Sequence, residues 1–238
     1  GKDLLNGKRF DKGGYILTYD YDKWSFIDPK EAQKKLNLPR NPRDYTSIAV
    51  TTDDSNDEIV YASSMGDGVI QYKNGTPVQS YNEKNAFKET AGGYGSGYCY
   101  IDGLAFDKNG NLWMTSSEVN HAVLVLDKAG AWHRLDIEQL RGVYTINDIL
   151  ITSTNDKWIY VPRNTPKLVM IPNSESLDEV SSYEFTTLID TDGKELTPSN
   201  YTCVAEDKDG YIWVGTNRGA VYFTKPRISS AEDKAATR

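Results

Sequence analysis

The sequence predicts an all-β chain built from repeated four-stranded units. A strand–turn–strand pattern recurs along the 238 residues, and the composition is rich in strand-forming aromatic residues, with 16 Tyr and 5 Trp. The clearest copies align without gaps, Leu104–Met114 with Val204–Val214, and weaker copies are centred on Ile59–Tyr61 and Trp158–Tyr160. The copies lie roughly 45 to 55 residues apart, which is the spacing of β-propeller blades. The sequence therefore predicts a β-propeller of four-stranded antiparallel blades.

The first two strands of each unit flank a turn rich in Asp and Gly. In the copy at Asp207–Gly210, the first Asp can accept hydrogen bonds from the turn amides and the final Gly can take a positive φ. The residues after the turn alternate at period two, which places Trp213 and Gly215 on one face. Ile212 and Val214 lie on the other face. We expect both faces to be buried between stacked blades, with Gly215 leaving room for a large side chain of the neighbouring blade.

The second half of each unit is predicted to be an outer hairpin. Three segments share an apolar strand, a polar turn and a second strand that begins with an aromatic residue or Val: Tyr15–Asp28, Val69–Tyr81 and Val123–Asp136. Only Pro29–Leu38 and Ile137–Leu140 are predicted to be helical, as insertions between blades.

The predicted propeller domain spans residues 1–227 and precedes a polar tail, 228–238. Its predicted parts are a partial blade at 15–28, blades at about 45–82, 101–137 and 145–188, and a partial blade at 201–223. The N-terminal hairpin could complete the last blade and close a ring of about five blades. The alternative is a fragment of a larger propeller, which the polar tail favours.

Charge and cysteine content exclude some function classes. The net charge of −7 argues against a nucleic-acid surface, because phosphate binding needs clustered positive charge. No apolar run approaches the roughly 18 to 20 residues that a membrane helix needs. Cys99 and Cys203 lie about two blades apart, and we expect free thiols rather than a disulfide.

The motif V-x-x-D-x-x-G-x-I-W-x-G-T-x-x-G, from Val204 to Gly219, resembles the two-component-regulator propeller repeat. Such repeats form the extracytoplasmic sensors of hybrid histidine kinases in Bacteroidetes-type bacteria. The runs Gly103–Ser117 and Gly219–Arg227 are similar to the surface β-propeller protein of the type IX secretion machinery. The resemblance covers most of Tyr45–Arg227 at the level of the repeat.

This resemblance implies a non-catalytic recognition or scaffold module of a larger sensor or secretion-associated surface protein. The module would be extracytoplasmic, in the periplasm or at the cell surface. Its implied partners are a glycan or surface polysaccharide, or a protein, together with other domains of the parent protein.

An enzymatic alternative stays open, because the repeat also resembles blades of lactonase-type and streptogramin-lyase propellers. A calcium-dependent lactonase or hydrolase would need oxygen ligands, for which Asp102, Asn147 and Asp148 are the candidates. These residues could equally cap strand ends. A lyase would need a His general base, either His121 or His133, and no acid partner for it is evident in the sequence. The sequence favours a non-catalytic role and points to no cofactor.

The loops at one end of a propeller are the expected binding face. They carry aromatic and planar hydrogen-bonding side chains, which suit a glycan or a peptide. The candidate ligand-binding residues are Tyr98, Tyr100, Asp102, Tyr144, Asn147, Arg163, Tyr201, Asn217 and Arg218. The alternative is that half of the tyrosines in this set pack between blades.

Overall fold

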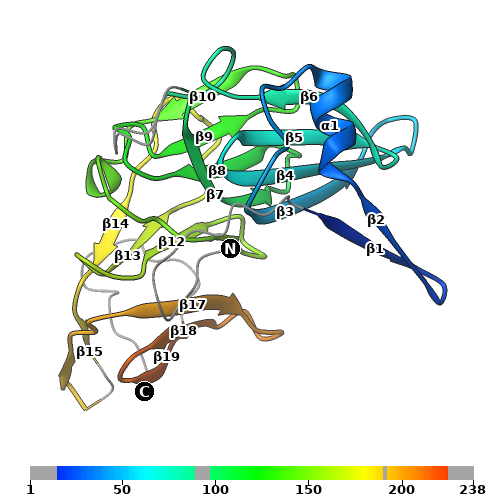
Figure 1. The fold of residues 1–238 in the computed structure, drawn as a ribbon. Coiled ribbons are helices and arrows are strands. Elements are labelled where there is room, and N and C mark those ends of the chain that lie inside the picture. Colours follow the sequence, from blue (N-terminus) through cyan, green and yellow to red (C-terminus); the bar gives the residue numbers. More distant parts are fainter. Residues whose placement is uncertain (1–14, 89–96, 190–191, 225–238) are drawn as a thin grey trace. The chain divides into compact units, whose positions relative to one another are not determined.

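The computed structural model describes residues 15–88, 97–189 and 192–224 (Figure 1). This part of the chain is almost entirely β-strand, with one short α-helix and one 3-10 turn. Neither helical segment in the described ranges is long and apolar enough to cross a membrane. The chain divides into two compact units, residues 1–104 and 105–238.

The first unit opens with the predicted hairpin and helix. Strands β1 (Ile16–Asp20) and β2 (Lys23–Ile27) pair antiparallel and lead into α1 (Pro29–Leu36). Asp28 caps this helix, because its carboxylate accepts a hydrogen bond from the backbone N–H of Lys30 at 2.9 Å. The helix is shorter at its C-terminus than predicted.

The rest of the first unit is an antiparallel meander in the order β3–β4–β5–β6. Its strands are β3 (Tyr45–Thr52), β4 (Glu58–Gly66), β5 (Gly68–Lys73) and β6 (Thr76–Tyr81). Strand β7 (Cys99–Phe106) begins in this unit beside the end of β4, and the boundary between the units falls within it. The core is apolar and joins the hairpin and α1 to the sheet through Ile16, Ala32, Val60, Ala62, Ile70 and Tyr72.

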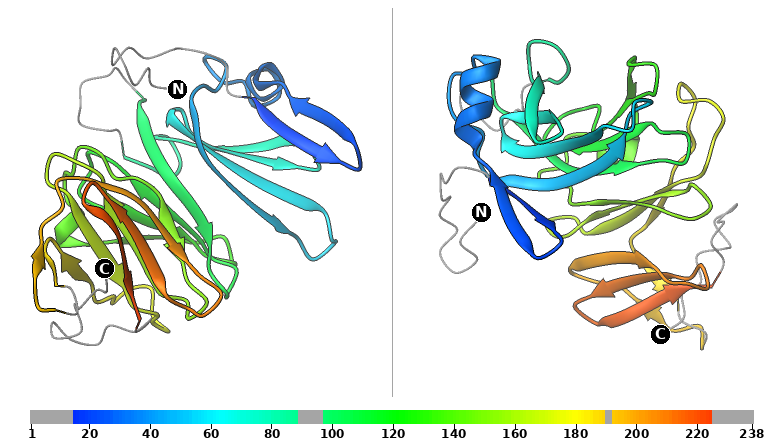
Figure 2. Two further views of the ribbon diagram at one scale, coloured as in Figure 1. Left: turned by 90° about the horizontal axis from the view of Figure 1, so that it is seen from below. Right: turned by 90° about the vertical axis from the view of Figure 1, so that its right-hand side faces the viewer.

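The described part of the second unit contains three groups of antiparallel strands that repeat one design, and each group is named here after its tryptophan. The Trp113 blade comprises β8 (Leu112–Ser116), β9 (Val123–Leu126) and β10 (Trp132–Leu135). The Trp158 blade comprises β11 (Ile149–Ile151), β12 (Lys157–Val161), β13 (Lys167–Ile171) and β14 (Tyr183–Phe185). The Trp213 blade comprises β17 (Tyr201–Glu206), β18 (Ile212–Thr216) and β19 (Gly219–Phe223) (Figure 2).

Short elements connect these blades. They are the 3-10 turn at Glu138–Leu140, at the segment predicted to be helical, and a two-stranded hairpin of β15 (Leu188–Ile189) and β16 (Glu195–Leu196).

The Asp turn of the repeat fixes the tryptophan that follows it. One carboxylate oxygen of Asp107 accepts the backbone N–H of Asn109 and of Asn111, each at 2.9 Å. The other accepts the indole N–H of Trp113 at 3.0 Å. Gly110 takes a φ of +82°. The predicted turn geometry is therefore confirmed, and the bond to the indole is an additional feature that the sequence analysis did not anticipate.

The Asp207 turn repeats this arrangement. Asp207 accepts two turn amides at 2.9 Å and the indole N–H of Trp213 at 2.7 Å, and Gly210 has a φ of +80°.

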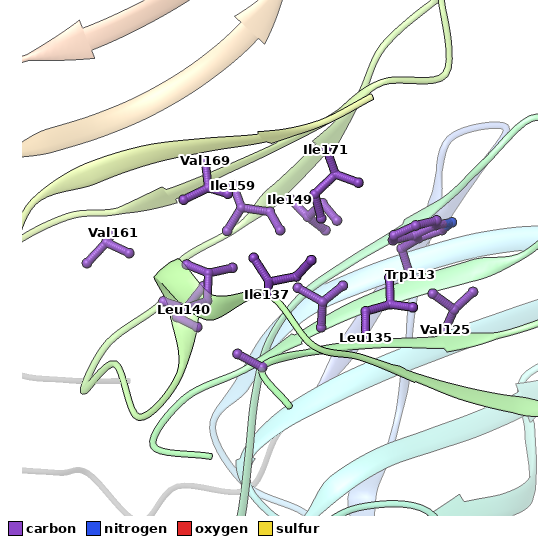
Figure 3. Packing of buried hydrophobic residues seen from close by; sticks show 13 residues of the cluster. Trp113, Val125, Leu135, Ile137, Leu140, Ile149, Ile159, Val161, Val169 and Ile171 are labelled. Carbon is purple, nitrogen blue, oxygen red and sulfur yellow. The ribbon is translucent and has the colours of Figure 1, made fainter. Parts of the chain in front are cut away.

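Tryptophans hold the blades of the second unit together. Trp113 is 1% exposed and shares a buried cluster with Ile149, Ile159 and Ile171 of the Trp158 blade (Figure 3). Trp158 is 0% exposed and packs in a second cluster with residues of the Trp213 blade, among them Val214. Each of these two tryptophans is thus buried against the blade that follows.

The Trp213 face departs from the prediction. Trp213 is 40% exposed, so the expectation that both faces of its strand are buried is wrong for this face. The expected space beside Gly215 is also absent. A Cβ atom on Gly215 would lie 2.5 Å from Thr202 Oγ1 and 2.6 Å from Cys203 Sγ, because the blade's own first strand fills that space.

Candidate functional site

The three candidate calcium ligands are divided between the two units. Asp102 is buried in β7 of the first unit, whereas Asn147 and Asp148 precede β11 in the second unit. Across residues 15–88, 97–189 and 192–224, no three His, Cys, Asp or Glu side chains are grouped as a metal site would require.

The two histidines lie in different settings. His121 is exposed in the loop after β8. His133 lies on β10, with Nε2 3.0 Å from Asp127 Oδ2 and Nδ1 3.4 Å from Asp178 Oδ1. These carboxylates raise the pKa of His133, the bond to Asp127 contributing most. The acid partners that the sequence did not reveal therefore exist, but they place His133 in a surface ion pair on an outer strand.

The three site candidates in the first unit are largely interior. Tyr98 is 4% exposed, and its ring lies so close to Gly66 that a Cβ atom there would be 2.6 Å from Tyr98 Cε2. Tyr100 is half-buried and Asp102 is buried. Tyr98 thus follows the alternative reading, in which part of the tyrosine set packs into the fold.

Asn147 belongs to a hydrogen-bond network centred on Tyr160. Its side-chain amide donates to Tyr160 Oη at 2.6 Å, and Tyr160 Oη donates to the carbonyl oxygen of Thr202 at 3.2 Å. The hydroxyl of Thr115 donates to the Asn147 carbonyl at 2.9 Å. Burial raises the pKa of Tyr160, so its hydroxyl stays protonated as the network requires. The network joins the three blades of the second unit at their strand ends, and Asn147 has a structural role in it.

Two loops of the second unit are tied to one short segment, residues 199–201. The backbone N–H of Tyr201 donates to the carbonyl of Pro162 at 3.1 Å, which fixes the loop that carries Arg163. The backbone N–H of Asn217 donates to the carbonyl of Asn200 at 3.2 Å, which fixes the β18–β19 turn. Asn217 Oδ1 also accepts the backbone N–H of Ser199 at 2.9 Å and that of Asn200 at 3.2 Å.

These bonds anchor the two loops that carry exposed arginines. Arg163 follows Pro162, and Arg218 follows Asn217. We call Arg163, Ser199, Asn200, Asn217 and Arg218 the Arg163–Arg218 face. Guanidinium and amide groups can bind carboxylates, phosphates and hydroxyls, so this face suits an anionic or polyhydroxylated ligand. Three of its members, Arg163, Asn217 and Arg218, are among the predicted site residues, whereas Ser199 and Asn200 are not.

The remaining candidates divide between surface and core. Tyr144 is 51% exposed on the connection before β11. Tyr201 is fully buried and donates its hydroxyl to the carbonyl of Phe185 at 3.2 Å. Tyr201 therefore also follows the alternative of packing within the fold. Neither cysteine forms a disulfide; Cys99 is buried and Cys203 is exposed.

Sequence reasoning missed a surface feature of the first unit. One face of the β1–β2 hairpin is aromatic and exposed, with the tilted rings of Tyr19 and Trp24 4.9 Å apart between centroids. An open cleft of about 810 Å³ lies beside this hairpin and extends to the β5–β6 turn. Its lining includes the acidic side chains Asp20, Asp28, Glu31 and Glu58. None of the nine predicted site residues lines this cleft.

Comparison with known proteins supports the repeat assignment. Residues 195–218 match the family model of the two component regulator propeller, which confirms the resemblance drawn from the Val204–Gly219 motif. No curated protein matches the chain.

Solved structures identify the fold. PorZ, an essential bacterial surface component of the type IX secretion system of Porphyromonas gingivalis, is similar with a TM-score of 0.81 and 21% identity. The match covers 94% of this chain and 31% of PorZ. YCF48 from Cyanidioschyzon merolae is similar with a TM-score of 0.50 and 16% identity, over 84% of this chain and 60% of that one. The likeness to PorZ confirms the predicted fold class, an all-β propeller.

An extracellular domain of a hybrid two component system from B. thetaiotaomicron is also similar, with a TM-score of 0.49 and 18% identity. That match covers 73% of this chain and 21% of the other. The chain thus spans less than two thirds of the length of each of these three proteins.

Proposed function

We propose that the chain is a non-catalytic extracytoplasmic recognition module that binds an anionic surface glycan through the Arg163–Arg218 face. The observation that carries the proposal is the pair of exposed arginines held on loops that share one anchoring segment. Backbone hydrogen bonds fix both loops, so little loop entropy would be lost on binding. We further propose that the module works within a larger sensor or secretion-associated surface protein.

The chemistry of the face favours an anionic sugar polymer over a neutral one. The chain carries a net charge of −7, so two exposed arginines on loops that are anchored to the same segment form a local exception. Guanidinium groups pair with carboxylate or phosphate in planar, bidentate geometry. The amides of Asn200 and Asn217 add donors and acceptors for hydroxyl groups, although Asn217 Oδ1 already accepts two backbone bonds. Tyr144, also exposed in the second unit, offers an aromatic surface.

The test is binding of polygalacturonate, lipopolysaccharide and neutral dextran to the purified chain, measured by calorimetry. We expect the chain to bind an anionic polymer with an affinity that falls as the salt concentration rises. The two arginines are exposed, so dissolved ions screen their charges. The double variant Arg163→Ala/Arg218→Ala should lose at least about tenfold in affinity, which corresponds to about 1.4 kcal/mol. Its unfolding midpoint should stay unchanged, because neither side chain is part of the core.

The matched control is Arg134→Ala, which removes an exposed arginine from the outer strand β10. It should bind as the wild type does. Equal affinity of the double variant and the wild type, or equal affinity for dextran and the anionic polymers, would contradict the proposal. A calcium-induced rise in melting temperature that EDTA reverses would instead support the calcium-dependent hydrolase alternative.

A further inference from the structure

Three tryptophans occupy one position of the repeat in the second unit. Trp113 and Trp213 each follow the Asp of their turn by six residues and donate their indole N–H to it. Trp158 stands at the same distance from Thr152, whose turn closes with the same backbone bond, Asn155 N–H to the Thr152 carbonyl at 2.8 Å. The three side chains are therefore structurally equivalent within their blades.

Two of the three are covered in the same way. Ile159, next to Trp158 on β12, lies in the buried cluster of Trp113. Ile212 and Val214, on both sides of Trp213, lie in the buried cluster of Trp158. In both cases the cover includes aliphatic residues that flank the tryptophan position of the next blade.

The third face has the same apolar character and is open. Trp213 stacks on Tyr222 with ring centroids 4.7 Å apart, and Tyr222 stacks on Tyr211 at 5.7 Å. Strand register places Ala205 beside Trp213 on this face, and Cys203 lies two residues before Ala205. Ala205 and Cys203 are both exposed. Contiguous exposed apolar surface of this kind marks an interaction site.

We propose that the Trp213 face of β17–β19 docks a further β-blade, whose second strand presents aliphatic side chains beside its own tryptophan position. The partner is defined by the two internal examples, in which the same face meets the same kind of cover. The proposal is independent of the Arg163–Arg218 face and of any glycan.

The repeat supplies its own test partner. Phe223 pairs with Ile212 as Leu126 pairs with Leu112, so Phe223 and Leu126 are equivalent positions. A second copy of residues 127–189 can therefore be appended directly after Phe223. The strands that cover Trp113 would then stand in the same sequence position relative to Trp213. The substitution Trp158→Thr in the appended copy makes its own outer face polar.

Cys203 provides the readout, because it is exposed on the face in question while Cys99 is buried. In the chain without the extension, Cys203 should react readily with 5,5′-dithiobis(2-nitrobenzoate). In the extended chain the reaction should slow at least about tenfold, because a docked blade excludes the reagent from the thiol. Ile159→Glu in the appended copy should restore the fast reaction, because it places a charge against Trp213.

Four results would overturn the proposal. One is a Cys203 that is already protected in the chain without the extension. Another is an extended chain that reacts as fast as the chain without the extension. A third is an extended chain whose circular dichroism shows no additional strand signal from the appended copy. The copy contains the residues that cover Trp113, so it should fold against Trp213 if the proposal is right. The fourth is protection of Cys203 by polygalacturonate or dextran in the chain without the extension, which would mark the aromatic face as a glycan platform.

Discussion

The Trp113 and Trp213 blades share a turn and differ in their surroundings. In both, an Asp binds two turn amides and the indole N–H, at nearly the same distances. Yet Trp113 is 1% exposed and Trp213 is 40% exposed. The difference teaches that the local motif orients the tryptophan, whereas a neighbouring blade determines how much stability it contributes.

The largest expected effect separates the two tryptophans. Trp113→Ala should lower the free energy of unfolding by about 3 to 5 kcal/mol, because it leaves a cavity between blades. Trp213→Ala should cost about 1 kcal/mol or less, because the ring is partly in water already. Urea unfolding followed by circular dichroism measures both. Equal losses would break the comparison.

The two turn carboxylates should differ next. Asp107→Ala leaves the buried Trp113 N–H without its acceptor, which costs about 1 to 3 kcal/mol in addition to the lost turn bonds. Asp207→Ala removes the same turn bonds, but the exposed Trp213 can bond to water. The difference between the two losses, measured in the same urea experiments, reports the buried indole bond together with the bond that Asn111 Nδ2 donates to Asp107 Oδ2 at 2.9 Å. A larger loss for Asp207→Ala would contradict this account.

The third tryptophan offers a gain of stability. Thr152 replaces the turn Asp in the Trp158 blade, and within the described ranges the buried Trp158 Nε1 has no hydrogen-bond partner. Thr152→Asp should supply the acceptor and stabilise the chain by about 1 kcal/mol. The control is the same substitution in a Trp158→Phe background, which has no N–H to satisfy. A gain in both backgrounds would show that the indole bond is not its cause.

The smallest effect concerns Lys157, which is buried with its ammonium 4.3 Å from the centroid of the Trp113 ring. Burial lowers the pKa of Lys157 below its ordinary 10.5, and the charges of Asp107 and Asp156 offset part of this. The fold therefore disfavours the protonated lysine, so the free energy of unfolding should rise as pH rises through the lowered pKa toward 10.5.

Lys157→Leu tests this directly, because Leu112 and Ile212 occupy the equivalent position in the other two blades. The difference in stability between the wild type and this variant should shrink as pH rises. A difference that does not change with pH would show that the lysine charge carries no such penalty.

Features set within a few residues could be predicted from the sequence. The Asp–Gly turn, the positive φ of Gly210 and the helix after Asp28 depend on neighbouring residues only, and all were confirmed. The indole bond to Asp207 escaped prediction although it is local, because the alternation of strand residues assigns a face but not a rotamer.

Features that depend on distant segments could not be predicted. The space beside Gly215 is filled by Thr202 and Cys203, through an irregularity in the pairing of β17 with β18. Tyr201 is the first residue of an inner strand, a position at which the sequence analysis expected an exposed binding residue. Its ring is buried, and its hydroxyl donates to the carbonyl of Phe185. The shared anchoring of the Arg163 and Arg218 loops likewise depends on backbone bonds between segments far apart in sequence.

The most direct test of the central claim is ¹⁹F NMR of the chain labelled with 5-fluorotryptophan. The five resonances can be assigned with single Trp→Phe variants. The account predicts a solvent isotope shift between H₂O and D₂O for Trp213 and none for Trp113 or Trp158, because of these three tryptophans only Trp213 is exposed to water. A Trp213 resonance as insensitive as that of Trp113 would contradict the claim that this blade face is open.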